Sequence, residues 1–356
     1  MSSILIKLKK GIRKLFPSND IRPFKCTAFH GTPNKKNIIF LLPTQVRPAG
    51  GSIVAHHQSD SINTIEYKNF SSQVFYPDKV HHLVTNFAHT SSFKRDKIFD
   101  IKNDFVIIPE MMVCRYAPEL IRLGVKYGIH VQNGYSLGGE VLLGIANFDD
   151  LLNTYENAQL IIGNSNDTIE NIKTVFPQFS EKIIRSYFVI NKSKYQSIEN
   201  KKNLITYMPR KLGNHSKLVL LFLNDKLPKD WSIKAIDGVT EQQVYDVFFD
   251  SKIFLSFSEF EGLAMPPAMA AMCGNRVIGY TGEANKEYFH LACFEEVYCG
   301  DIKDFVKKLL EAVERFDNNQ ETLDLKSIEY LQDFFSDKNQ MRYLCELMDV
   351  IDSTLV

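Results

Sequence analysis

The stretch 258–289 places an acid just before a short run of small residues and a glycine turn after the next apolar run. The acid is Glu261, and the residues that follow predict a helix that starts near Pro266 and ends at Gly274. The first turn of a helix offers free backbone N–H groups and the positive end of a dipole, which together bind phosphate. Gly282 brings more backbone amides to the same place. These residues therefore predict a diphosphate pocket with an acid beside it.

The elements that must position this pocket are strand–helix–strand units, because short runs rich in Val, Ile and Phe alternate with longer helical patterns. The first half of the chain has such runs at 37–43, 105–110, 128–133 and 158–165. The second half has them at 203–209, 217–223, 252–258 and 276–282. Each is predicted to be a buried strand of a parallel sheet whose carboxyl end carries a loop. The fold class is therefore α/β.

A length of 356 residues suits two domains. The segment 188–203 is polar and rich in lysine, with little apolar periodicity, so it is the predicted linker. We predict four parts: a basic amphipathic helix, a first α/β domain, a second α/β domain, and a C-terminal helix that crosses back to the first domain. Their predicted bounds are 1–20, 21–190, 191–330 and 331–356.

Composition excludes several classes of protein. With 42 basic and 42 acidic residues the formal net charge is zero, which gives a nucleic-acid partner no global electrostatic support. The six cysteines are scattered, without a CxxC pair or zinc-ligand spacing, as is typical of reduced cytosolic thiols. The longest apolar runs are far shorter than the roughly 20 residues of a membrane-spanning helix. No secretory signal is recognisable, so we expect a cytoplasmic protein.

The first 17 residues have two alternative interpretations. At about 100° per residue one helical face is apolar and the other basic. The apolar face holds Ile4, Leu5, Leu8, Ile12, Leu15 and Phe16 and the basic face Lys7, Lys10, Arg13 and Lys14. Such a helix can lie on the anionic inner face of the cell membrane as a peripheral contact. It can equally pack on its own domain and leave the basic face in solvent.

Residues 261–274 resemble the donor site of retaining glycosyltransferases of the GT-B fold. The resemblance is to the large group 1, family 4-like set, whose motif runs Glu-Gly-Phe-Gly-Leu-Pro, two residues, then Glu-Ala-Met-Ala-Cys-Gly. In register, Glu261 matches the first acid, which in that family contacts the donor sugar. Met269 stands where the family has the second acid, which holds the ribose hydroxyls. The resemblance implies two Rossmann-like domains that face each other across a cleft, a nucleotide-sugar co-substrate and no other cofactor.

The same resemblance assigns a set of donor-binding residues. Arg210 and Lys211 follow the first predicted strand of the second domain, where the family places a basic pair on the donor diphosphate. The complete set comprises Arg210, Lys211, Gly262, Leu263, Ala264, Met265, Gly282 and Glu283. The simpler alternative is that Arg210 and Lys211 are ordinary strand-end charges and Glu261 a surface turn acid. No Asp-x-Asp ends a predicted strand, so we expect no metal.

In the first domain, Gly50 and Gly51 resemble the family's glycine loop, which opens a helix toward the cleft and the acceptor. Gln132 and Asn133 fall at the strand end where many relatives carry a histidine near the transferred sugar, so together with Glu261 they are the candidate catalytic residues. The alternatives are a tight turn for the glycines and a cap on the next helix for Gln132 and Asn133. The histidines at 56, 57 and 130 are interpreted as structural.

The function implied is transfer of a hexosyl or deoxyhexosyl group from a nucleotide sugar to a glycan or lipid-linked glycan, as in bacterial surface polysaccharide synthesis. Two alternatives stay open: a nucleotide-sugar epimerase or hydrolase of the same fold, and a binding subunit without catalysis. The epimerase would need several titratable groups at the cleft, and the sequence offers few. Met269 favours the binding subunit, because it removes an acid that the family uses.

Overall fold

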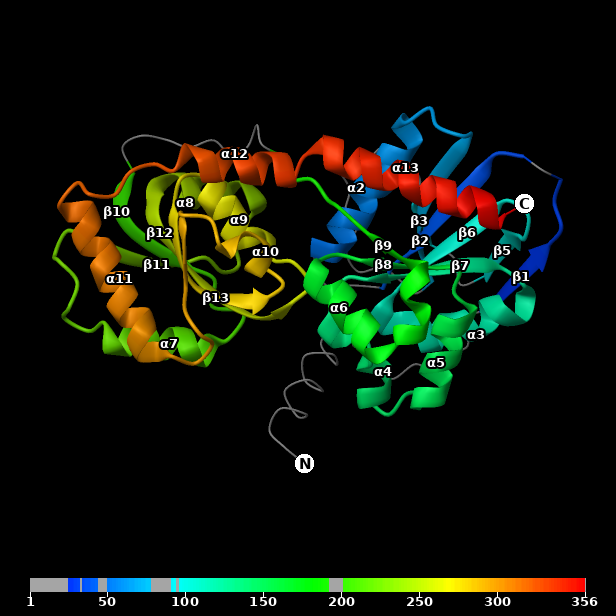
Figure 1. Ribbon diagram of the computed structural model, residues 1–356, viewed down its shortest axis with the longest axis horizontal. Helices are drawn as coiled ribbons and strands as arrows, with labels where there is room; N and C mark the ends of the chain where they lie inside the picture. The colour runs from blue at the N-terminus through cyan, green and yellow to red at the C-terminus, as the bar shows by residue number, and fades with distance from the viewer. Residues whose placement is uncertain are drawn as a thin grey trace. The chain divides into compact units, whose positions relative to one another are not determined.

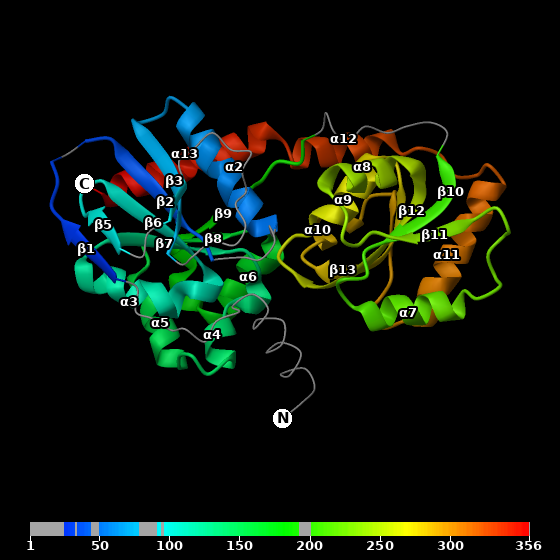
Figure 2. The same cartoon turned by 180° about the vertical axis from the view of Figure 1, so that it is seen from behind.

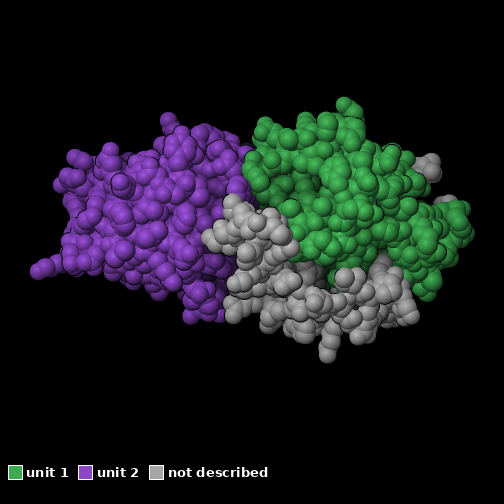
Figure 3. All heavy atoms as spheres, turned by 90° about the horizontal axis from the view of Figure 1, so that it is seen from below, with its two compact units in different colours: residues 1–188, 340–356 green, residues 189–339 purple. Residues whose placement is uncertain are grey.

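A computed structural model describes residues 25–32, 34–43, 50–77, 91–93, 96–191 and 201–355 (Figure 1). The predicted helix at 1–20 and most of the predicted linker lie outside these residues. The chain forms two compact units, coloured separately in Figure 3. Unit 1 comprises the described residues up to Phe188 and those from Gln340 onward, and unit 2 comprises Val189–Asn339.

Unit 1 is built on a seven-stranded parallel sheet of order β4-β3-β2-β6-β7-β8-β9. Its strands are β2 Lys36–Leu41, β3 Phe70–Tyr76, β4 Ser91–Phe93, β6 Asp104–Pro109, β7 Lys126–Val131, β8 Leu160–Gly163 and β9 Ile183–Arg185. A separate pair consists of β1 Lys25–Phe29 and β5 Asp96–Asp100. All six residues of β6 are buried, as expected for a strand covered on both faces.

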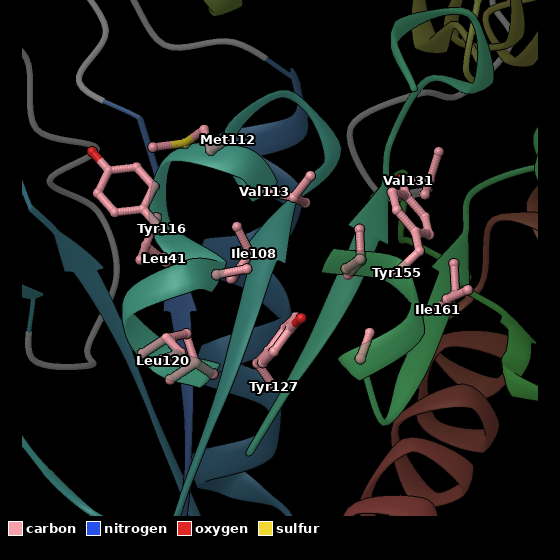
Figure 4. Packing of buried hydrophobic residues seen from close by; sticks show 14 of the residues in the cluster. Leu41, Ile108, Met112, Val113, Tyr116, Leu120, Tyr127, Val131, Tyr155 and Ile161 are labelled. Carbon is pink, nitrogen blue, oxygen red and sulfur yellow. The ribbon is translucent and has the colours of Figure 1, made fainter. Parts of the chain in front are cut away.

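The helices of unit 1 cover both faces of this sheet (Figures 1 and 2). They are α2 Gly50–Thr64, η1 Glu110–Met112, α3 Val113–Leu123, η2 Gly134–Ser136, α4 Gly139–Leu142, α5 Phe148–Asn157, α6 Asn166–Val175, η3 Pro177–Lys182 and α13 Asp337–Thr354. On one face Tyr116 and Leu120 of α3 and Tyr155 of α5 pack on the strands (Figure 4). On the other face α2 and α13 pack, and Leu347 of α13 is fully buried there.

Unit 2 has a five-stranded parallel sheet of order β11-β10-β12-β13-β14. The strands are β10 Lys202–Tyr207, β11 Ser232–Ala235, β12 Ser251–Glu261, β13 Arg276–Glu283 and β14 Phe294–Glu296. The helices are α7 Gly213–Phe222, α8 Glu241–Asp250, α9 Met265–Met272, α10 Lys286–Phe289, α11 Ile302–Asp317 and α12 Leu325–Phe334. Because α12 packs on α9, unit 2 extends past the predicted end at 330, and the chain joins unit 1 from Gln340.

The predicted strand at 217–223 is wrong, because these residues belong to α7 and the turn after it. Val219 and Leu223 pack into the core that α7 and α11 share, whereas Leu218 and Leu221 are 43% and 67% exposed. A short apolar run cannot be assigned to helix or strand from its composition alone, since a half-exposed helix can also be apolar all round. The predicted α/β class, with two Rossmann-like parallel sheets, is confirmed.

Candidate functional site

The carboxyl ends of β12 and β13 lie side by side in unit 2 and bring two predicted acids together. Glu261 is the register partner of Glu283, after an irregularity in the pairing that begins at Ser258. Phe260 at this point has a left-handed φ of 46°. An irregularity of this kind re-aims the side chains beyond it. This irregularity at the end of β12 therefore sets the position of the Glu261 side chain at the carboxyl edge of the sheet.

Glu261 makes an ion pair with Lys211, whose Nζ donates to Glu261 Oε1. The Glu261 side chain is 13% exposed and the Lys211 side chain 46%. Lys211 lies in the loop between β10 and α7, and Arg210 beside it is exposed. The structure thus brings together the predicted sugar-binding acid and one member of the predicted phosphate-binding pair. The arrangement places a cation that can face phosphate next to an acceptor that can face hydroxyl groups.

Gly282 permits the close approach of the two strand ends. Its φ is 61°, and a Cβ at this position would lie 2.8 Å from the Cβ of Ser258 and 2.9 Å from the Cγ of Glu261. A larger residue would therefore push the turn away from Glu261. Glu283, which also has a positive φ, pairs with Lys286 at 2.7 Å.

The start of α9 is held by two side chains that sequence reasoning missed. Ala264, the N-cap residue, donates its N–H to Asn285 Oδ1 at 2.7 Å, and its carbonyl accepts from the Tyr288 hydroxyl at 2.7 Å. Both partners come from the segment after β13. The signal in the sequence was that this segment directly follows the predicted glycine turn. Asn285 and Tyr288 hold the loop that carries Gly262 and Leu263 and leads into Met265, the first residue of α9.

The predicted helix is confirmed, but its N-terminus offers fewer donors than predicted. Pro266 and Pro267 occupy its first turn, and proline has no N–H. The donors that remain near this end are backbone N–H groups such as those of Leu263 and Met265, together with the helix dipole. Met269 lies on α9 and is half-buried. Its thioether is a weak acceptor, unlike the carboxylate that the resemblance implies at this position.

In unit 1, the predicted residues Gly51, Gln132 and Asn133 also come together. Gln132 Nε2 donates to the Gly51 carbonyl at 3.2 Å, where α2 begins. A Cβ on Gly51 would lie 1.9 Å from Gln132 Oε1, so only glycine accommodates this amide. Asn133 caps η2, because its Oδ1 accepts from the N–H of Tyr135 at 3.0 Å. Gly50 is the first residue of α2.

Glu110 is a residue of this site that sequence reasoning missed. It follows β6, and its carboxylate accepts the backbone N–H groups of Gln132 at 3.0 Å and Asn133 at 3.2 Å. The side chain is buried, and burial raises its pKa to about 7 although the backbone donors lower it. The acid that ends the apolar run 105–110 was the available signal.

The histidines that the structure places in the interior are structural. His130 Nε2 is 2.8 Å from Asn164 Oδ1, and burial lowers the pKa of His130 to about 4. His56 Nε2 is 2.6 Å from the Tyr76 hydroxyl. Within the described residues, no group of three or more His, Cys, Asp or Glu side chains is arranged to hold a metal ion. No helix in the described part of the chain is both long and apolar enough to cross a membrane.

The architecture is similar to that of several solved structures that match the chain at low sequence identity. Anabaena HepE in complex with UDP and glucose superposes with a TM-score of 0.61 at 12% identity, over 90% of this chain and 100% of that one. The lipopolysaccharide outer core galactosyltransferase WaaB gives 0.62 at 13%, over 89% and 99%. Sucrose-phosphate synthase from Thermosynechococcus elongatus gives 0.61 at 10%, over 90% and 99%. No family model and no curated protein sequence matches the chain. At these identities the likeness establishes the GT-B fold.

Proposed function

We propose that this protein is a glycosyltransferase that moves a sugar from a nucleotide-sugar donor to a glycan or lipid-linked glycan acceptor. The observation that carries the proposal is the Glu261–Lys211 pair beside the start of α9, at the carboxyl edge of the unit 2 sheet. Ligands of open α/β sheets bind at this edge. The fold adds support, since solved structures of the same fold include complexes with UDP and with UDP-glucose.

In this proposal unit 2 stabilises the leaving diphosphate. Arg210 and Lys211 supply fixed positive charge, and the backbone around Gly262, Leu263, Met265 and Gly282 supplies N–H groups, while Ala264 lines the site with its N–H bonded to Asn285. Preorganised donors of this kind act where charge develops in the transition state. Glu261 accepts hydrogen bonds from the sugar hydroxyls, so that binding energy from the sugar orients its anomeric carbon. Glu283 lies beside it at the end of β13.

Unit 1 binds the acceptor in this proposal, with Gly50 and Gly51 at the start of α2 and with Gln132 and Asn133 at the end of β7. The reaction is retaining and independent of metal. The proton of the acceptor goes to the leaving phosphate, which fits a site where His130 is buried and bonded to Asn164. We place the reaction in bacterial surface polysaccharide synthesis on the cytoplasmic side, with residues 1–17 as the peripheral membrane contact.

A panel of radiolabelled nucleotide sugars tests the proposal. A transferase should hydrolyse its own donor slowly when no acceptor is present, whereas an epimerase would release a new nucleotide sugar. No turnover of any donor would contradict the proposal. A parallel titration with nucleoside diphosphates identifies the base, because binding to the folded state raises the melting temperature.

A binding subunit without catalysis is the second candidate, and Met269 on α9 is the observation that favours it. Such a protein would bind one nucleoside diphosphate in the melting assay and leave every labelled donor intact. Met269→Glu then tests how the ribose is held. It would strengthen donor binding if the ribose lies against α9, and leave it unchanged if other groups hold the ribose.

A further inference from the structure

Two buried carboxylates tie the segment 132–140 of unit 1 to the segment 110–114. Glu110, at the start of η1, accepts the N–H groups of Gln132 and Asn133 at 3.0 and 3.2 Å. Glu140, in α4, accepts the N–H of Cys114 at 2.7 Å, in the first turn of α3. Each segment thus supplies a carboxylate to the backbone of the other. We call this arrangement the reciprocal latch.

The latch lies where the proposed acceptor residues are. Gln132 and Asn133 begin the segment, and its middle is anchored by Leu137, which is buried in the core. The Gln132 side chain reaches Gly51 from the same position. Because Leu137 is held by its own packing in the core, we expect release of the latch to reorient Gln132 and Asn133 and to leave the unit folded.

We propose that Glu110 and Glu140 are positioning residues, which fix the segment 132–140 so that the Gln132 amide and Asn133 are presented at the carboxyl edge of the unit 1 sheet. The inference rests on the proposed function, because it concerns the acceptor side of that site. It also gives a role to Glu110 and Glu140, two buried acids that take no part in the proposed chemistry.

Both oxygens of Glu110 accept backbone N–H groups, which the ionised carboxylate does more strongly than the protonated acid. Burial raises the pKa of each acid to about 7, so near neutrality the closed latch binds protons that a solvated carboxylate would release. Other ionisable groups face the latch from the neighbouring helices. Tyr155 of α5 interacts with both acids, and Cys114 and Arg115 of α3 face Glu140.

Amide hydrogen exchange on the full chain tests the latch directly. After correction for intrinsic rates, we expect the N–H groups of Gln132, Asn133 and Cys114 to gain about tenfold in protection between pH 8 and pH 6, because carboxyls opened to solvent have lower pKa values and protons therefore favour the closed latch. In Glu110→Gln the protection of Gln132 and Asn133 should be low at both pH values. Glu156→Gln removes an exposed acid of the same unit and should behave as wild type.

Turnover tests the positioning role. We expect kcat of Glu110→Gln to fall about tenfold or more, the donor KM to change less than about twofold, and the limb of the pH profile near neutrality to disappear. Wild-type kcat and pH profile in a folded Glu110→Gln would overturn the proposal, as would pH-independent protection in the wild type. If the wild type turned over no donor, the proposed function would fail. The hydrogen-exchange experiment alone would then decide whether Glu110 and Glu140 hold the segment 132–140. If Glu110→Gln did not fold, Glu140→Gln and the wild-type pH series would decide.

Discussion

Glu261 and Lys211 illustrate how one contact can serve two roles at the scale of a residue. An ion pair that is partly open to solvent contributes about 0–1 kcal/mol to stability, so stability alone gives little reason for it. Its place at the strand ends, where a Cβ on Gly282 would lie 2.9 Å from the Cγ of Glu261, is what the proposed donor site requires. Replacement of either residue is therefore expected to reduce activity much more than stability.

Glu261→Gln should abolish transfer and leave the protein folded. The amide keeps the shape of the side chain but accepts weaker hydrogen bonds and loses the pairing with Lys211, so kcat/KM should fall by about 100-fold or more. The melting temperature should stay within a few degrees, about what a loss of 1 kcal/mol produces. Glu296→Gln, an exposed acid of unit 2, is the matched control. Near-normal activity with a normal melting curve would remove Glu261 from the site.

Gly51→Ala should impair activity much more than stability. The added Cβ overlaps the end of the Gln132 side chain, which can rotate away, so unfolding should change by less than about 1 kcal/mol. The amide of Gln132 would then no longer reach Gly51. Gly213→Ala is the control, since nothing lies within 4 Å of its added Cβ at the start of α7. Steady-state kinetics and urea unfolding of both variants measure the two effects. Equal activity in the two would show that the Gln132–Gly51 contact is not functional.

At the scale of elements, α9 depends on the segment after β13. Asn285→Ala removes the acceptor of the Ala264 N–H and should lower the free energy of unfolding by about 1–3 kcal/mol. It should also weaken nucleoside diphosphate binding, because the loop before α9 loses its anchor. Asn318→Ala, at the exposed end of α11, is the control. Calorimetric titration measures the affinity, and an unchanged value would show that Asn285 only stabilises the fold.

The sequence predicts an element when the residues that define it are close together in the chain, and fails where the defining contacts are distant. β6 could be predicted, because the buried residues that follow Asp104 form an apolar run, and α9 could be predicted from its prolines and Gly274. The helix α7 could not, since its exposed face is apolar as well. Contacts such as Glu110 with Gln132, or Asn285 with Ala264, join residues that are far apart in the chain. No local pattern encodes them, so the sequence predicts the strand ends but not the side chains that brace them.

At the scale of the whole molecule, the two units have separate cores, and we expect them to unfold in separate transitions. Leu347→Ala in α13 should destabilise unit 1 by about 2–5 kcal/mol and shift only its transition. Leu309→Ala in α11 should shift only that of unit 2. Differential scanning calorimetry of both variants is the measurement. A single transition that both variants shift equally would show that the units unfold together.

The pH dependence of stability provides a test of the buried acids on the whole protein. Glu110 and Glu140 have pKa values raised from 4.5 to about 7, so between these values the folded state binds more protons than the unfolded state. The free energy of unfolding therefore falls as pH rises through this window, by up to about 1.4 kcal/mol per pH unit for each acid. His130 acts in the opposite sense, since its pKa is lowered from 6.5 to about 4 and its contribution rises with pH over that range. Comparison of wild type with Glu110→Gln/Glu140→Gln cancels the histidine. The double variant should gain stability relative to wild type from pH 5 to about 7.5 and then level off in urea unfolding. A difference that stays constant with pH would show that neither acid titrates near neutrality.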